Sequence, residues 1–235
     1  MLTLLTTTGC RPEAFNLCQK YMLNQTYQGK VKWVIVDDGE IPQPINFKRD
    51  NWTLEIIRPQ PYWRKGQNTQ HRNFLAGLEV ISDDEKVLII EDDDIYLSGW
   101  LDKVVSEFEL SGKELIGQSQ NKYYNVVTGE ITQHDNDKHS SLCSSAVRGE
   151  ALKAFRHHTK QGWKLIDLML WRHHNSKHLF KSDMVIGVKA MAGRAGIAGG
   201  HLVNQQNFKN STYDNDDTLK SWVGDYADAY RQYRK

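Results

Sequence analysis

The stretch Val87-Leu88-Ile89-Ile90-Glu91-Asp92-Asp93-Asp94-Ile95-Tyr96 decides the fold of this 235-residue chain. Its first four residues are apolar and three of them are β-branched, which is typical of a buried strand. Four carboxylates follow directly, at the end of the strand where open α/β sheets bind their ligands. Adjacent carboxylates repel one another, so we expect a counter-charge, and Mg²⁺ or Mn²⁺ with a diphosphate as a further ligand supplies one. The alternative is a solvated acidic turn before a helix, because carboxylates also favour helix N-termini.

Two further strands are expected upstream, over residues 1–8 and 32–36. A turn that ends in Pro12 follows the first strand, and proline suits the first position of the amphipathic helix expected over 14–25. A strand, a helix and a strand of these lengths form a right-handed parallel βαβ unit. The second strand ends in Asp37-Asp38-Gly39, and carboxylates at this edge can accept hydrogen bonds from a nucleobase or a ribose.

Four motifs resemble the family 2 glycosyltransferases of the GT-A fold and occur in that family's order: Thr7-Thr8-Gly9-Cys10-Arg11-Pro12, Val34-Ile35-Val36-Asp37-Asp38-Gly39, His71-Arg72-Asn73-Phe74-Leu75-Ala76-Gly77-Leu78 and the acidic run. The resemblance covers residues 1 to about 110 and extends more weakly to about 190. It implies an α/β fold with a mostly parallel central sheet flanked by helices, and a nucleotide-sugar donor, above all a UDP-sugar. The chain departs from the family in having Thr-Thr-Gly-Cys-Arg for the usual Pro-Thr-Tyr-Asn-Arg, and Glu40 for the frequent serine after Asp-Asp-Gly.

The resemblance also implies how the acidic run is used. Its last motif acid, Asp93, binds Mn²⁺ or Mg²⁺ with Asp94 beside it, and Glu91 meets the ribose or a metal-bound water. A shift of one place would give these roles to Asp92 and Asp94. The cation bridges the diphosphate and neutralises charge as the leaving group departs.

Other residues are implied for the donor. Thr8, Asp37 and Asp38 are assigned to the base and the ribose, together with Asp92 from the acidic run. Arg11 and Arg72 either face the diphosphate or form structural ion pairs.

His201 follows a glycine-rich stretch and would complete the metal shell, although a lone histidine is more often structural. That stretch lacks the Gly-Lys-Ser/Thr ending of a P-loop.

One acid stands in an otherwise apolar stretch, from Gly162 to Trp171, whose apolar residues have helical spacing. The resemblance places the catalytic carboxylate at the start of such a helix, which assigns Asp167. It would deprotonate the acceptor hydroxyl for in-line attack at the anomeric carbon, with inversion. The alternative is an N-terminal helix cap, and the two roles are compatible because both place Asp167 at the helix start.

Length and composition predict one domain over residues 1–235, with 39% hydrophobic and 25% charged residues. We expect the part up to about residue 110 to bind the nucleotide sugar and the remainder to bind the acceptor. The apolar and aromatic spacing over 219–233 predicts a C-terminal helix that docks on the domain or on a second subunit. No stretch approaches the roughly 20 apolar residues of a membrane span.

The three cysteines, Cys10, Cys18 and Cys143, are scattered and lack metal spacing. They indicate a reducing, cytoplasmic environment, with Cys18 and Cys143 as buried thiols. The chain enters its first strand directly, so no signal peptide is expected.

Basic residues concentrate between Arg148 and Lys181, where eight Lys and Arg face two acids, a net charge of +6. The whole chain carries +1, so the remainder carries −5. Because the resembled family receives its acceptor in this half, a polyanionic acceptor is expected, with phosphates contacted by Arg148, Lys153, Arg156 and Lys160. The alternative is a solvated helix face.

Gly9-Cys10-Arg11-Pro12-Glu13 and His139-Ser140-Ser141-Leu142-Cys143 resemble glycosyltransferases encoded by bacteriophages. This resemblance implies transfer of a sugar to 5-hydroxymethyl pyrimidines in DNA, in the host cytoplasm, by an enzyme that reaches a base edge or flips the base out. One alternative is a transferase that elongates a surface glycan on a lipid or saccharide acceptor. Another is a degenerate domain that only binds nucleotide, for which loss of the acidic motif or of the base would be the hallmark.

Overall fold

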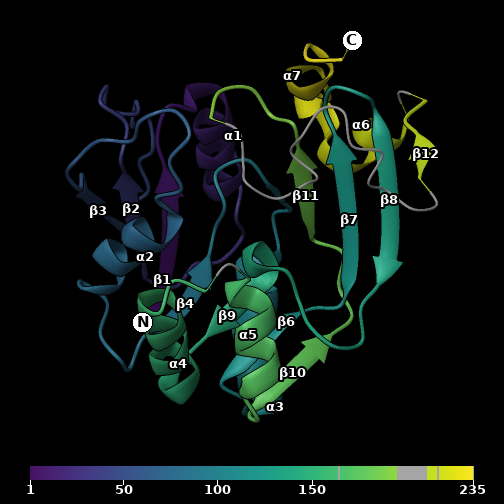
Figure 1. Cartoon of the computed structure of the whole chain (residues 1–235). Coiled ribbons are helices and arrows are strands. Elements are labelled where there is room, and N and C mark those ends of the chain that lie inside the picture. Colours follow the sequence, from purple (N-terminus) through teal and green to yellow (C-terminus); the bar gives the residue numbers. More distant parts are fainter. Residues whose placement is uncertain (164, 195–210, 216, 235) are drawn as a thin grey trace.

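A seven-stranded sheet forms the centre of the structure (Figure 1). The structure is a computed structural model that describes residues 1–163, 165–194, 211–215 and 217–234. The strand order is β10-β6-β9-β4-β1-β2-β3. Strands β4, β1, β2 and β3 are mutually parallel, as are β6 and β10, whereas β9 is antiparallel to both β4 and β6. The bounds are β1 Leu2–Thr8, β2 Val31–Asp37, β3 Trp52–Ile57, β4 Lys86–Ile89, β6 Leu115–Gln118, β9 Ser145–Val147 and β10 Lys177–Phe180. The prediction of a mostly parallel central sheet is confirmed.

The register of the central strands brings their carboxyl ends to one edge. Thr8 at the end of β1 is paired with Asp37 at the end of β2, and Leu5 is paired with Ile89 at the end of β4. The acidic run 91–94 therefore begins beside the turns that follow β1 and β2. This carboxyl edge is the position where parallel sheets bind ligands.

A second sheet of five strands, which the sequence did not predict, packs beside the first. Its order is β12-β8-β7-β11-β5, and β5 follows the acidic run directly. Strand β11 pairs antiparallel with β5, so it lies next to the acidic loop. The bounds are β5 Ile95–Tyr96, β7 Gln120–Asn125, β8 Glu130–Asp135, β11 Val185–Lys189 and β12 Thr212–Tyr213.

Helices cover both faces of the central sheet because its strands are apolar on both faces. Side chains alternate along β2: Val34 packs in the core beneath α2, α4 and α5, whereas Trp33 and Ile35 pack in the core that α1 and α3 share with the second sheet. The helix bounds are α1 Pro12–Leu23, α2 Gln70–Leu78, α3 Trp100–Ser111, α4 Gly149–Lys160, α5 Ile166–His173, α6 Asp217–Val223 and α7 Ala227–Arg231, with 3₁₀ turns η1 Leu142–Ser144 and η3 Gly224–Tyr226.

The C-terminal helix expected over 219–233 is divided into α6, η3 and α7. Gly224 has a positive φ of 57°, a conformation that ends a helix and suits glycine. The segment docks on this chain's own α1, where the hydroxyls of Tyr21 and Tyr230 are 2.7 Å apart. Among the described residues, no helix has the length and apolar character needed to span a membrane.

Candidate donor-binding site

Two glycine turns meet at the carboxyl edge and bring β1 and β2 together there. Gly9 has a φ of 146°, and a Cβ at this position would lie 2.3 Å from Asp38 Oδ1 and 2.8 Å from the Gly39 nitrogen. Only glycine fits both the backbone angle and the space. The turn after β1 is thus pressed against the acidic end of β2.

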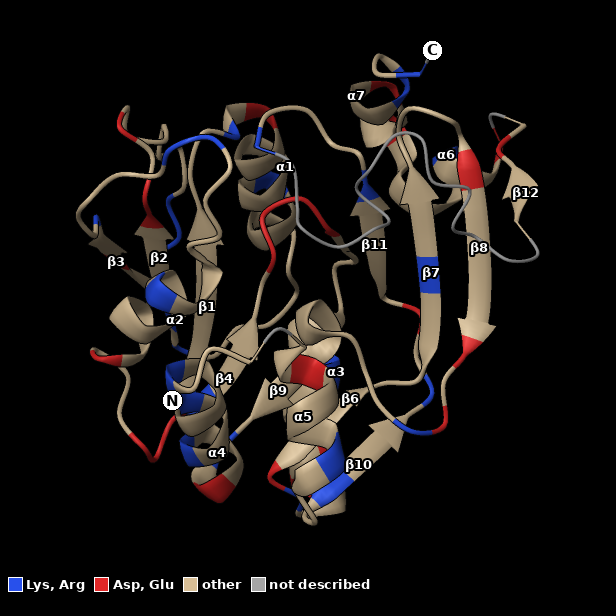
Figure 2. Ribbon diagram, viewed as in Figure 1, with Lys and Arg blue, Asp and Glu red and all other residues tan. Residues whose placement is uncertain are grey.

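Arg11 and Thr8 hold the middle of the acidic loop. The Thr8 hydroxyl donates to Asp92 Oδ2 at 2.7 Å, and Arg11 Nη1 lies 2.8 Å from Asp92 Oδ1. Arg11 Nη2 also pairs with Asp93 Oδ2. Both oxygens of Asp92 are therefore engaged, and the guanidinium supplies the counter-charge that the repelling carboxylates need. Of the two roles left open for Arg11, the structure displays the ion pair. Figure 2 shows this acidic loop above β4, between α1 and β11.

Asp38 is fully buried and is held by three side chains. Its Oδ2 accepts from the Thr69 hydroxyl and lies 3.0 Å from Arg72 Nη2. Its Oδ1 lies 2.8 Å from Nη1 of Arg194, on the segment after β11. Thr69 and Arg194 were not singled out from the sequence, because their partner is distant along the chain.

Asp37 orders the loop that follows β2. Its two oxygens accept from the backbone nitrogens of Gly39, at 2.9 Å, and Gln43, at 2.8 Å. Arg58 Nε lies 3.6 Å from Oδ2. The role expected for Asp37, binding of the base or the ribose, stays a prediction.

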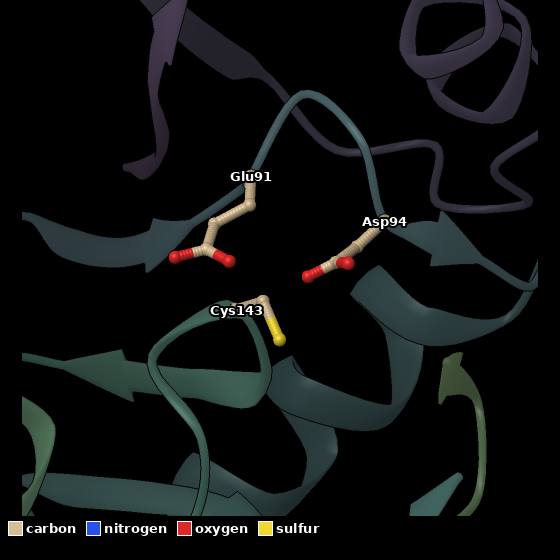
Figure 3. Close-up of side chains that lie close together, drawn as sticks. All are labelled: Glu91, Asp94 and Cys143. Atoms are coloured by element: carbon tan, nitrogen blue, oxygen red, sulfur yellow. The ribbon is translucent and has the colours of Figure 1, made fainter. Parts of the chain in front are cut away.

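Glu91, Asp94 and Cys143 form a buried cluster on the other side of the acidic loop (Figure 3). One ligand atom from each residue lies within 4.8 Å of the other two. Asp94 Oδ1 accepts from the Val188 nitrogen at 2.7 Å, whereas Oδ2 is buried with no hydrogen-bond partner among the described residues. Among the described residues, these three side chains form the group that could hold a cation. No pattern in the sequence links Cys143 to the acidic run.

The electrostatics of the loop reflect crowding of like charges away from water. Burial raises the pKa of Asp92 to about 6, although Arg11 lowers it. Burial, followed by the charges of Asp94 and Asp93, holds the pKa of Glu91 well above its ordinary value. Burial lowers the pKa of Lys189, but the neighbouring carboxylates raise it by a larger amount, so the pKa lies above its ordinary value. A cation at this loop would relieve the same repulsion.

Asp167 lies in the first turn of α5, as predicted, and is half-buried. The residue before α2, Thr69, contacts Asp38 at the carboxyl edge, and His71 in the first turn of α2 bonds the Trp163 carbonyl at 2.7 Å. This bond brings the segment before α5 to the carboxyl edge. Leu165 is the residue at the N-cap of α5, and no side-chain cap hydrogen bond is found there among the described residues. Both roles considered for Asp167, base and helix cap, stay predictions.

The four basic residues expected to contact the acceptor lie on or before α4. Arg148 follows β9, which is antiparallel to β4, so it lies at the sheet edge opposite the acidic loop, where Nε bonds the Lys113 carbonyl at 2.9 Å. Arg156 bonds the carbonyls of Leu78 and Ile81. These two side chains are engaged within the fold.

Lys153 is exposed and pairs with Glu150, whereas Lys160 is exposed at the end of α4 that returns toward the carboxyl edge. Cys18 and Cys143 are buried free thiols, as predicted. His201 lies outside the described residues.

A mixed α/β fold with an acidic loop at the carboxyl edge of its parallel strands is the fold of glycosyltransferases of the GT-A type. Comparison with solved structures finds it in TarS of S. aureus, whose crystal structure matches with a TM-score of 0.56 at 10% identity, over 80% of this chain and 36% of that chain. Structures of TarS 1–349 in complex with UDP and with UDP-GlcNAc match with TM-scores of 0.54 and 0.51 at 10% and 9% identity. They are matched over 80% of this chain and 60% and 58% of theirs.

The chain thus spans about a third of the first TarS structure and less than two thirds of the shorter form. No family model matches the sequence, and no curated protein matches it. The likeness shows the fold.

Proposed function

We propose that the protein is a glycosyltransferase that moves a sugar from a UDP-sugar to an acceptor hydroxyl. The observation that carries the proposal is the joining of Asp38, Arg72 and the acidic loop at one sheet edge, in a fold whose solved relatives were crystallised with UDP and UDP-GlcNAc. Asp38 and Thr8 serve the base and ribose with Asp37. Arg11 and Arg72 form ion pairs with the acidic loop and with Asp38 in the structure, and they would exchange part of these contacts for the diphosphate of a bound donor.

The acidic loop fits a divalent cation, Mn²⁺ or Mg²⁺. Carboxylate oxygens are the ligands that these ions prefer, and Asp94 Oδ2 is buried without a hydrogen-bond partner among the described residues. Asp93 and Asp94 would hold the ion, with His201 as a further ligand and with Glu91 and Asp92 toward the donor. When bound, the ion neutralises charge on the diphosphate.

Asp167 acts as the general base in this proposal. Its carboxylate accepts the proton of the acceptor hydroxyl, whose oxygen attacks the anomeric carbon as the bond to the diphosphate breaks. Attack opposite the leaving group inverts the configuration at that carbon. The half-buried position in the first turn of α5 leaves the carboxylate accessible to an acceptor.

The base assignment is tested with Asp167→Asn, which keeps the size of the side chain but removes its proton-accepting ability. Transfer should fall by roughly 10²–10⁴, the usual contribution of a general base, while UDP affinity stays within a factor of two or so. Asp225→Asn, at an exposed site in η3, is the control and should keep full turnover. Near-normal transfer by Asp167→Asn would remove Asp167 from the mechanism.

For the acceptor we propose DNA that carries 5-hydroxymethyl pyrimidines, as expected of a bacteriophage-encoded enzyme. The support is the +6 segment 148–181. Of its four candidate contacts, Lys153 and Lys160 have exposed side chains. A glycan acceptor is the competing possibility, and it requires no basic surface.

DNA binding is tested by measuring duplex affinity against salt concentration. Each phosphate contact contributes about 0.9 to the slope of log affinity against log salt, so Lys153→Ala with Lys160→Ala should flatten that slope by up to about 1.8. Lys30→Ala, exposed before β2, should leave it unchanged. Mass spectrometry of nucleosides should then detect sugar on hydroxymethylated DNA and none on unmodified DNA. Elongation of a glycan with no mass gain on DNA would discard the DNA acceptor and leave the glycosyltransferase proposal in place.

A further inference from the structure

The guanidinium of Arg194 lies at the carboxyl edge and makes the two kinds of contact by which proteins bind a nucleobase. Nη1 is 2.8 Å from Asp38 Oδ1, Nη2 donates to the Thr69 hydroxyl oxygen at 2.6 Å, and the group lies 4.9 Å from the centre of the Trp63 ring. A guanidinium is planar, carries donors along its edge and stacks on aromatic faces. Proteins hold bases by the same two contacts, stacking on a ring and hydrogen bonds along an edge.

The groups around Arg194 are fixed by contacts of their own. The Trp63 backbone nitrogen donates to the Asp38 carbonyl at 2.7 Å, and its indole Nε1 donates to the Gln67 carbonyl at 2.9 Å. The second carboxylate oxygen of Asp38 is held by Thr69 and Arg72. The indole and the carboxylate therefore keep their positions without help from Arg194.

Burying the charged guanidinium of Arg194 costs free energy. Burial lowers the pKa of Arg194 below its ordinary value, and the attraction of Asp38 and Asp92 offsets this only in part. A neutral base in the same place would avoid the cost of burying that charge.

We propose that Arg194 occupies the base position in the nucleotide-free protein, and that Trp63 stacks on the base of the donor after Arg194 has left. The inference rests on the proposed function, which supplies the nucleotide donor. Once Arg194 leaves, Asp38 Oδ1 accepts the ring N–H of the base. Uracil carries that N–H, whereas cytosine presents a lone pair at the same ring position, so UDP binds more tightly than CDP.

The stacking role is tested by titrating UDP into Trp63→Ala and Trp63→Phe. The alanine variant should bind UDP about 5- to 150-fold more weakly, which corresponds to the roughly 1–3 kcal/mol of a base–aromatic stack. Phenylalanine keeps an aromatic face and should restore most of the affinity. Trp222→Ala, a half-buried tryptophan on α6, is the matched control. UDP affinity that is unchanged in Trp63→Ala would overturn the inference and leave the proposed function standing.

The displacement of Arg194 is tested with Arg194→Ala, beside Arg64→Ala as the control for loss of one exposed positive charge. Removing a group that competes for the base position should tighten UDP binding several-fold, because the open site becomes more populated. CDP should bind at least about tenfold more weakly than UDP to the unchanged protein. Weaker UDP binding by Arg194→Ala would mean that Arg194 contacts the donor, and would overturn the inference. Failure of the unchanged protein to bind UDP at all would overturn the proposed function and this inference with it.

Discussion

Gly9 shows at the scale of a single residue how the carboxyl edge of the sheet depends on backbone conformation as well as on charge. Its backbone angle and the 2.3 Å from its missing Cβ to Asp38 Oδ1 leave no room for a side chain. Arg11, two residues further on, pairs with Asp92 and Asp93 of the acidic loop. The acidic loop and the glycine turn after β1 therefore lie in contact at the same edge of the sheet.

Gly9→Ala should reduce UDP affinity at least about tenfold and lower the free energy of unfolding by more than about 1 kcal/mol, because both strain and a clash with Asp38 are introduced. Titration with UDP and urea denaturation measure the two effects. Gly66→Ala is the matched control, since Gly66 also has a positive φ, of 88°, but has no atom within 4 Å of the added Cβ. Equal losses in the two variants would mean that the backbone angle alone matters.

At the scale of elements, the C-terminal segment is attached to α1 by a few specific contacts. The hydroxyls of Tyr21 and Tyr230 are both buried and lie 2.7 Å apart, and Asn24 bonds the Tyr226 hydroxyl at 3.0 Å. Burial raises the pKa of Tyr21 and Tyr230, so both remain neutral and can share one hydrogen bond. This hydrogen bond attaches α7 to α1 within the core that α1 shares with the sheets.

Tyr230→Phe should lower the free energy of unfolding by about 1–3 kcal/mol, because it leaves the Tyr21 hydroxyl buried and unpaired. The double variant Tyr21→Phe with Tyr230→Phe removes both hydroxyls and should be more stable than the single variant. Urea denaturation of the unchanged protein, the single variants Tyr21→Phe and Tyr230→Phe, and the double variant gives the coupling between the two residues. Additive losses would contradict the shared hydrogen bond.

At the scale of the whole molecule, the proposed donor site joins residues from both sheets. Val188 of β11 donates to Asp94, and Arg194 after β11 pairs with Asp38 after β2. A ligand at this edge would contact side chains that are bonded to residues of both sheets. Donor binding should therefore stabilise the fold as a unit.

UDP at about 100 times its dissociation constant, with Mn²⁺ present, should raise the melting temperature by about 5–10 °C, since one such ligand adds about 2.7 kcal/mol and each kcal/mol shifts a domain of this size by about 2–4 °C. Thermal denaturation with and without a chelator measures the shift. Asp93→Asn should keep the fold but lose the Mn²⁺-dependent part. An equal response to Mn²⁺ in Asp93→Asn would place the ion elsewhere.

The sequence by itself determined the three central strands β1, β2 and β4, the helix α1 between the first two, and the carboxyl-edge position of the acidic run. Those features depend on local patterns: the apolar run 87–90 is buried on both faces, and Asp37-Asp38 follows its strand directly. The second sheet was missed because two of its strands, β5 and β12, have only two residues each, and because β11 pairs with β7 and β5, which are distant along the chain. Strand β11 bonds β5 across some ninety residues.

Only the tertiary structure decided which charges meet. Arg194 lies 156 positions from Asp38, and Arg11 lies 81 positions from Asp92, so no spacing rule connects them. The same is true of Arg148 and Arg156, which the charge pattern assigned to the acceptor and which the fold engages with backbone carbonyls. The hydrophobic pattern of a strand or helix depends on residues that are close together in the sequence. The partner of a charged side chain lies on a distant segment, which comes near only when the sheets assemble.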